Sequence, residues 1–199
     1  MNNISLKSWS LETRVIDLIQ EVGQLFDGCN LCYGHGTEHP LDEAAALVLF
    51  VLGIDYLDAE EPSFSKVSAV EFKLIEKLVD QRIQERKPLA FLTQEAFFCG
   101  YKFYVDERVL IPRSPMAELI RKQFEPWIDS ASVERVLDVA TGSGCLAVAI
   151  AKNFPGTEVV ASDVSEGALE VASINVDGLS VRKQGTLVES GLFENIEGV

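Results

Sequence analysis

The first ninety residues carry apolar positions at helical spacing. Residues 11–26 place six of them on one face: Val15, Leu18, Ile19, Val22, Leu25 and Phe26. A second helix is expected from Pro40 to about residue 52, and because it is apolar nearly all round we expect it to be buried. Ser68 and Glu71 form a capping box that opens a third helix, whose expected core face is Leu74, Ile75, Leu78, Val79 and Ile83. The pattern predicts a helical domain over residues 1–95.

The period changes after residue 95. Residues 96–99 and 102–105 are rich in aromatic residues and flank a Gly-Tyr turn, which predicts a β-hairpin that residues 109–111 could extend. Ser114 followed by Pro115 is typical of an N-cap and the first position of a helix. That helix would carry Met116, Leu119, Ile120 and Phe124. We assign residues 96–112 to a hairpin that links two domains.

Strands and helices alternate from residue 135 onward. The expected strands are residues 136–139, residues 158–162 and, more weakly, a segment around Val181. The expected helices are residues 145–153 and 166–176, the second capped by Ser165. Alternation of this kind predicts a parallel sheet with right-handed crossovers, so residues 113–199 should form an α/β domain.

The chemistry of this domain lies in the segment Asp138-Val-Ala140-Thr141-Gly142-Ser143-Gly144. A strand ends there, a loop of small residues follows, and a helix begins. Glycines let a ligand approach the backbone closely, and the helix amino terminus offers unpaired N–H groups to a negative group. In S-adenosylmethionine that group is the methionine carboxylate, and Asp138 could hold the methionine ammonium directly or through water.

A second carboxylate, Asp163, ends the next predicted strand, a spacing that suits a residue accepting both ribose hydroxyls. An isolated Asp is usually a turn or capping residue, but two that frame a glycine loop favour a nucleoside site. Gly142, Gly144 and Ala147 also fit a loose dinucleotide fingerprint. Against that reading, four residues separate the apolar strand from the first glycine, and an acidic residue would lie badly near a pyrophosphate.

Charge and composition narrow the class of protein. The chain is 47% hydrophobic, enough for a real core, and no apolar run is long enough to cross a membrane. The amino terminus lacks the pattern of a signal peptide, so we expect a cytoplasmic protein. The net charge is −14, with 10 Lys and Arg against 18 Asp and Glu in residues 1–112, and 7 against 13 in residues 113–199. With no basic stripe, we expect no direct sequence-specific nucleic-acid binding, whereas a basic protein partner would be attracted.

Two further groups of residues are candidates for metal binding or for substrate contact. Cys29, Cys32, His35 and His39 have metal-binding side chains, but the spacing is too short for a usual zinc finger, and we expect no metal. His35 lies between two glycines and Arg113 just precedes an N-cap. Either could contact a substrate, and either could be structural: a helix cap at His35, a plain salt bridge at Arg113.

Five segments together resemble one family. Asp138-x-x-Thr-Gly-Ser-Gly144 is similar to the cofactor loop of the protein-(glutamine-N5) methyltransferases. Residues 98–115 and 118–120, together with Tyr33-Gly-His-Gly-Thr37 and residues 40–44, resemble the branch that modifies large-subunit ribosomal protein L3. The release-factor branch typically reads Pro-Arg-x-Asp-Thr-Glu where this chain has Pro-Arg-Ser-Pro-Met-Ala at residues 112–117.

The resemblance implies a helical substrate-docking domain and a Rossmann-like class I methyltransferase domain that uses S-adenosylmethionine. It implies a glutamine side-chain amide of ribosomal protein L3 as acceptor. Residues Ala140, Thr141, Gly142, Ser143 and Gly144 would line the cofactor, Asp163 would bind the ribose, and Leu192 would lie near the adenine beside Gly191, where the family commonly has Asp.

The family's catalytic Asn-Pro-Pro-Tyr motif does not occur in residues 1–199, so no catalytic residue is assigned. We expect the chain to be the amino-terminal part of a methyltransferase and to be inactive alone. Three alternatives remain: an adenine-specific DNA N6-methylase, a release-factor glutamine methyltransferase, and a non-catalytic nucleotide-binding regulator.

Overall fold

A computed structural model describes residues 6, 10, 12–34, 37–54 and 65–196. The chain divides into two compact units, Met1–Thr93 and Gln94–Val199, which are considered separately below. The division falls just before the hairpin that the sequence analysis treated as a linker. The structure differs from that assignment, because the hairpin packs into the core of the second unit.

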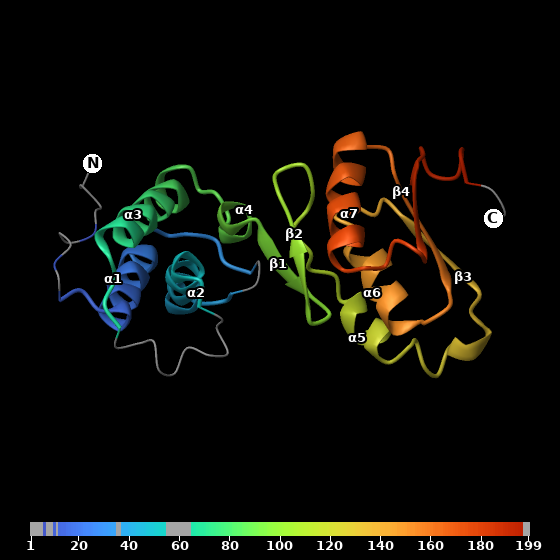
Figure 1. The fold of residues 1–199 in the computed structure, drawn as a ribbon, viewed down its shortest axis with the longest axis horizontal. Helices are drawn as coiled ribbons and strands as arrows, with labels where there is room; N and C mark the ends of the chain where they lie inside the picture. Colours follow the sequence, from blue (N-terminus) through green and yellow to red (C-terminus); the bar gives the residue numbers. More distant parts are fainter. Residues whose placement is uncertain (1–5, 7–9, 11, 35–36, 55–64, 197–199) are drawn as a thin grey trace. The chain divides into compact units, whose positions relative to one another are not determined.

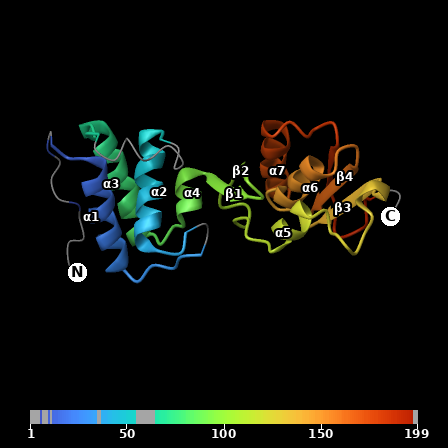
Figure 2. The ribbon, with the colours of Figure 1, turned by 90° about the horizontal axis from the view of Figure 1, so that it is seen from below.

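The first unit is helical, as its periodicity predicts. Its helices are α1 (Val15–Asp27), α2 (Pro40–Leu52), α3 (Ala69–Gln84) and the short α4 (Leu89–Thr93). Helix α2 packs against both α1 and α3 (Figures 1 and 2). One apolar core runs through the unit and includes Phe26, Leu47 and Ile75, all fully buried. The capping box of Ser68 and Glu71 is present in α3.

Three details of these helices differ from expectation. Helix α1 begins at Val15 rather than near residue 11, because Arg14 is extended and pairs in a β-bridge with Lys66. On α3, Leu74 is 43% exposed instead of lying on the core face. On α2, Leu41 and Phe50 are also exposed, so the helix is buried on one face only.

A buried ion pair crosses this unit. Arg82 of α3 donates to Glu43 of α2 over 2.5 Å, and both side chains are under a tenth exposed. Arg82 also donates to the Cys32 carbonyl over 2.8 Å, and Thr37 donates its hydroxyl to Glu43 over 3.3 Å. The pair therefore fixes the segment between α1 and α2 against both helices.

The second unit contains a hairpin and a three-stranded parallel sheet. Strands β1 (Glu95–Phe98) and β2 (Tyr101–Tyr104) pair antiparallel, and α5 (Met116–Arg121) and a 3₁₀ turn (Ser130–Ser132) follow. The order is then β3 (Arg135–Val139), α6 (Cys145–Asn153), β4 (Glu158–Asp163), α7 (Glu166–Gly178) and β5 (Gly185–Glu189). The sheet order is β3-β4-β5, all parallel, which confirms the predicted α/β class.

One face of the sheet forms the core of this unit. Helices α6 and α7 lie on that face (Figures 1 and 2), where Val159 and Ala161 of β4 are buried. Phe98 and Phe103 of the hairpin join the same core, with their rings edge to face. This burial is why the hairpin belongs to the second unit.

Two strand predictions were wrong. The third strand, β5, begins at Gly185, whereas Val181 lies in the turn after α7 and is buried there, with its N–H donating to the Val176 carbonyl. Residues 109–111 do not extend the hairpin. Helix α5 also ends before Phe124, which has a positive φ of 59°.

Candidate functional site

The carboxyl ends of the three parallel strands bring the predicted site residues to one edge of the sheet. Residues 140–144 follow β3, residues 163–165 end and follow β4, and residues 190–192 follow β5. Two backbone hydrogen bonds join these segments: Thr141 N–H to the Ser162 carbonyl (2.9 Å) and Ser190 N–H to the Asp163 carbonyl (3.0 Å). In open parallel sheets this edge is where ligands bind.

The loop between β3 and α6 turns through left-handed conformations. Ala140, Gly142 and Gly144 have φ of 58°, 57° and 76°. A side chain on Gly142 would meet open space, whereas a Cβ on Gly144 would lie 3.1 Å from the Ala172 Cβ of α7. A side chain at position 144 would therefore be disfavoured by φ and crowded against Ala172, and the loop lies directly against α7.

Asp138 lies beneath this loop instead of projecting from the strand end. It is 8% exposed, and its Oδ2 accepts hydrogen bonds from the Thr141 hydroxyl (2.6 Å) and the Ala147 N–H (3.2 Å). Burial raises the pKa of this carboxyl, and the hydrogen bonds oppose that shift. The carboxylate thus connects the end of β3, the loop and the first turn of α6.

Asp163 occupies the position expected from its spacing. It ends β4, is half-buried, and accepts the Gly142 N–H at Oδ2 (2.9 Å) and the Ser165 N–H at Oδ1 (3.0 Å). A carboxylate oxygen has more than one lone pair, so both oxygens can accept further hydrogen bonds from a ligand. Two apolar side chains in the segments after β4 and β5 are exposed: Val164 is 75% exposed and Leu192 is 66% exposed.

The remaining loop residues differ in accessibility. Thr141 and Ser143 are buried, whereas Ala140 is exposed. Cys145, the first residue of α6, has its pKa raised to about 11, chiefly by burial. Its thiol therefore stays protonated at neutral pH and is no candidate nucleophile.

One contact of this loop was not predicted from the sequence. The Ser143 carbonyl accepts a hydrogen bond of 2.8 Å from the side chain of Asn175 on α7, which is 3% exposed. The signal was available, because Asn175 lies between Val171, Ala172 and Val176 on the buried face of a helix. A polar residue at a core-facing position needs hydrogen-bond partners.

The other predicted site residues lie elsewhere. Arg113 is exposed, and it forms no hydrogen bond or ion pair with the residues that the structure describes. His35 lies outside the described residues. Among those that are described, Cys29, Cys32 and His39 included, no group of three or more His, Cys, Asp or Glu side chains could hold a metal ion. The described helices include none that is long and apolar enough to span a membrane.

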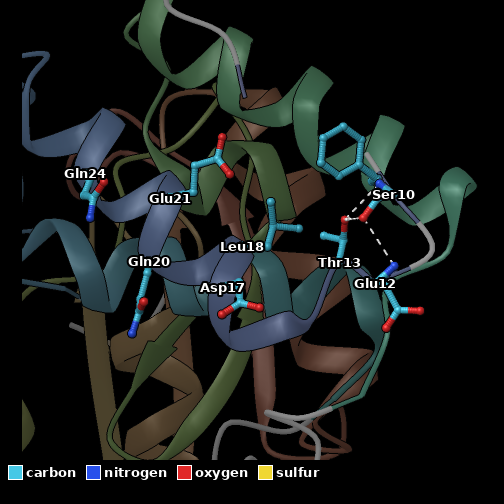
Figure 3. A pocket seen from close by; sticks show the side chains of 9 residues that line it. Ser10, Glu12, Thr13, Asp17, Leu18, Gln20, Glu21 and Gln24 are labelled. Carbon is cyan, nitrogen blue, oxygen red and sulfur yellow. Dashed lines mark hydrogen bonds between the residues drawn. The ribbon is translucent and has the colours of Figure 1, made fainter. Parts of the chain in front are cut away.

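A polar hollow of about 450 Å³ lies beside α1 in the first unit. Figure 3 shows its lining from α1 and from the residues before it, including Glu12, Asp17 and Glu21. Glu12 is paired with Lys66 over 2.9 Å, and Asp17 is paired with Arg14 over 2.7 Å. Because Glu12 and Asp17 are each paired with a cation, they offer less to a cationic ligand than the composition of the hollow suggests.

Comparison with known proteins agrees with the resemblance carried by the motifs. Residues 118–198 match the methyltransferase small domain family. The chain is 42% identical over 180 residues to the ribosomal protein uL3 glutamine methyltransferase of Bordetella pertussis, covering 89% of this chain and 60% of that protein. It is 38% identical to the protein of the same name from Neisseria meningitidis serogroup B, covering 94% of this chain and 62% of that protein. The chain thus spans about three fifths of the length of these relatives.

Similar solved structures include the amino-terminal domain of human METTL16 and the S-adenosylmethionine-dependent methyltransferase SibL. The first is 15% identical, with a TM-score of 0.38, covering 72% of this chain and 53% of that one. The second is 17% identical, with a TM-score of 0.32, covering 91% of this chain and 60% of that one.

Proposed function

We propose that the edge formed by residues 138–144, 163–164 and 190–192 binds S-adenosylmethionine. We propose further that the protein to which this chain belongs transfers the methyl group to a glutamine side-chain amide of ribosomal protein uL3. The observation that carries the cofactor proposal is the Asp163 carboxylate, which ends β4 and is held against the glycine loop by the Gly142 N–H. The similarity to the two uL3 glutamine methyltransferases supports the acceptor.

The charges at this edge favour S-adenosylmethionine over a dinucleotide. The Gly142 N–H, which a pyrophosphate would need, already donates to Asp163. Asp138 lies beneath the same loop, and the negative charge of Asp163 contributes to raising the pKa of Asp138. A pyrophosphate would meet two carboxylates, whereas the ammonium and sulfonium groups of S-adenosylmethionine would be attracted to them.

Each group on the cofactor has a candidate partner on this edge. Asp163 has acceptor capacity for the two ribose hydroxyls. Val164 and Leu192 offer exposed apolar surface to an adenine ring. The amino-terminal end of α6, which begins at Cys145, suits the methionine carboxylate, since the partial positive charge at a helix start favours a negative group. Asp138 would act on the ammonium through its charge, directly or through water.

When bound, S-adenosylmethionine supplies an electrophilic methyl group on a positively charged sulfur. A glutamine amide nitrogen is a poor nucleophile because its lone pair is delocalised into the carbonyl. In-line transfer therefore requires protein groups that orient this nitrogen and stabilise the charge that develops on it. In the family that the chain resembles, these groups belong to the Asn-Pro-Pro-Tyr motif. Residues 1–199 are therefore proposed to supply the part of the active centre that binds the methyl donor.

The charge of the chain suits this acceptor. Ribosomal proteins are basic because they bind RNA, and this chain carries a net charge of −14 spread over both halves. Long-range attraction would raise the rate of encounter, and it would weaken with added salt. A protein that modifies uL3 would meet it in the cytoplasm, where we place this one.

Isothermal titration calorimetry with S-adenosylhomocysteine, which cannot react, tests the cofactor proposal. We expect binding to the 199-residue chain and at least tenfold weaker binding to Asp163→Ala. The matched control is Asp177→Ala, which removes an exposed carboxylate of α7 paired with Arg182, and which should bind like the wild type. Tighter binding of a nicotinamide dinucleotide than of S-adenosylhomocysteine would refute the proposal.

The acceptor is tested with the product of the whole reading frame. Isotope-labelled methyl from S-adenosylmethionine should appear in uL3, and mass spectrometry should locate it on a glutamine side chain. A release factor and an adenine-containing DNA duplex serve as competing acceptors. Label in either of these, with none in uL3, would replace the proposed acceptor while leaving the cofactor site intact.

A further inference from the structure

We infer that Asn175 is a positioning residue that fixes the cofactor loop to the β1–β2 hairpin; this rests on the proposed function of that loop. The side-chain amide of Asn175 makes three hydrogen bonds. Its Nδ2 donates to the Ser143 carbonyl (2.8 Å) and to the Tyr104 carbonyl (2.9 Å), and its Oδ1 accepts the Tyr104 N–H (2.7 Å). One buried side chain thus connects helix, hairpin and loop.

The orientation of this amide follows from its partners. The Tyr104 N–H can only donate, so it must face Oδ1, and this leaves both Nδ2 hydrogens facing carbonyl oxygens. Both donors are therefore used, and the acceptor is used as well. No other uncharged side chain of similar size offers two donors and one acceptor in this arrangement. A shorter or singly polar residue would leave the Ser143 or the Tyr104 carbonyl unpaired.

Further contacts hold the same three elements together. One turn before Asn175 on α7, Ala172 lies where a Cβ on Gly144 would approach it to 3.1 Å. After the hairpin, Arg108 donates to Asp106 over 2.6 Å and also pairs with Glu170 of α7. Helix α7 therefore contacts two successive loop residues and the segment that leaves the hairpin.

The bond to Ser143 bears on the ligand because it fixes a peptide unit inside the cofactor loop. Gly142 and Gly144, on either side of Ser143, both have positive φ, and such a loop has alternative backbone conformations. An unpaired Ser143 carbonyl would be relieved most easily by rotation of this peptide unit. That rotation would redirect the Gly144 N–H, which belongs to the same peptide unit and donates to the Thr141 carbonyl (3.0 Å), and it would thereby change the turn that leads into α6, where the cofactor is proposed to bind.

The test compares Asn175→Asp with Asn153→Asp. The first keeps the size and the acceptor but removes both donors. The second removes a donor of the same kind, since Asn153 Nδ2 donates over 2.8 Å to Ala149 within its own helix, remote from the loop. Binding of S-adenosylhomocysteine is measured by calorimetry well below each unfolding midpoint, so that every variant is folded. In parallel, ¹⁵N–¹H spectra record the amide signals of Gly142 and Gly144.

We expect Asn175→Asp to weaken binding at least tenfold and to shift both glycine signals, with Asn153→Asp within twofold of the wild type and its glycine signals unchanged. If Asn175→Asp does not fold, Asn175→Ser replaces it with the same expectation. Unchanged affinity and unchanged glycine signals, together with a lowered midpoint, would overturn the inference and leave a purely structural asparagine. If the wild type itself does not bind, the proposed function fails, and the glycine signals alone decide whether Asn175 positions the loop.

Discussion

Replacing Gly144 with alanine tests the contact between the cofactor loop and α7. Gly144 has φ of 76°, and a Cβ built there would lie 3.1 Å from the Ala172 Cβ and 3.3 Å from its Cα. The substitution therefore adds two separate costs, one from the backbone conformation and one from packing. Gly142→Ala is the matched control, because φ there is 57° and an added Cβ meets nothing within 4 Å.

The expected magnitudes follow from these two costs. A left-handed conformation costs a residue with a Cβ about 1–2 kcal/mol. Forcing a methyl group into a close-packed contact costs about 1–3 kcal/mol more, since the neighbouring atom is backbone-proximal and cannot rotate away. We therefore expect Gly144→Ala to lower the free energy of unfolding by about 2–5 kcal/mol and Gly142→Ala by about 1–2 kcal/mol.

Hydrogen exchange of peptides from α6 and α7 measures this free energy for the second unit alone. Ala172→Gly alone should cost about 1 kcal/mol, because glycine is unfavourable inside a helix. The double variant Gly144→Ala/Ala172→Gly should lose less stability than the sum of the two single variants, because removing the Ala172 Cβ relieves part of the packing cost. Equal effects of Gly144→Ala and Gly142→Ala, with no coupling to Ala172, would show that α7 does not approach the loop as described.

Three further outcomes are expected. Arg82→Met leaves Glu43 buried without its partner and should destabilise the first unit by about 3–5 kcal/mol in urea unfolding, with unchanged binding of S-adenosylhomocysteine. The Asp106 pKa is lowered to about 2, chiefly by its hydrogen bond with Arg108, so its stabilising contribution is complete above the ordinary value of 3.8 and is lost as the pH falls towards 2. Asp106→Asn should therefore flatten the acid branch of the stability profile, and the effect should be small because the Arg108 guanidinium is open to solvent. Iodoacetamide at pH 8 should alkylate the exposed Cys32 before the buried Cys145, because burial raises the pKa of the Cys145 thiol to about 11. Equal rates of alkylation would contradict the burial of Cys145.

Local capping signals predicted two helix starts correctly and one incorrectly, because α5 begins at Met116 with Pro115 as its N-cap, where Ser114 was the predicted cap. The capping box at Ser68 and the N-cap at Ser165 are both present, and α2 and α6 have the predicted limits. The third strand was misplaced around Val181, whereas the apolar residues of β5 are Leu187 and Val188. In the structure Val181 closes a turn, whereas β5 pairs with β4 through a segment that starts with Gly185 and ends with Glu189.

The sequence predicted where the candidate residues lie on the sheet better than it predicted their contacts. The sequence spacing predicted that Asp163 ends a strand beside the glycine loop, because the lengths of the strand and helix in a βαβ unit fix where the second strand ends. The sequence could not show that Asp138 lies beneath the loop, since that depends on the direction of its side chain. Nor could it show the bonds from Asn175, whose hydrogen-bond partners Tyr104 and Ser143 lie 71 and 32 residues away.

The two carboxylates of the candidate site differ in burial and in their contacts. Asp138 is buried, its pKa is raised, and its Oδ2 accepts two hydrogen bonds from the loop and from α6, so it acts first on the shape of the loop. Asp163 is half-exposed and holds the loop through a single amide of Gly142, which leaves acceptor capacity towards the open edge. Under the proposed function, the cofactor would contact Asp163 at this edge, while Asp138 would act on it from beneath the loop. The glycine loop is thus fixed from beneath by Asp138, from the side by Asn175 and from the edge by Asp163, and each of these contacts comes from a different element of the second unit.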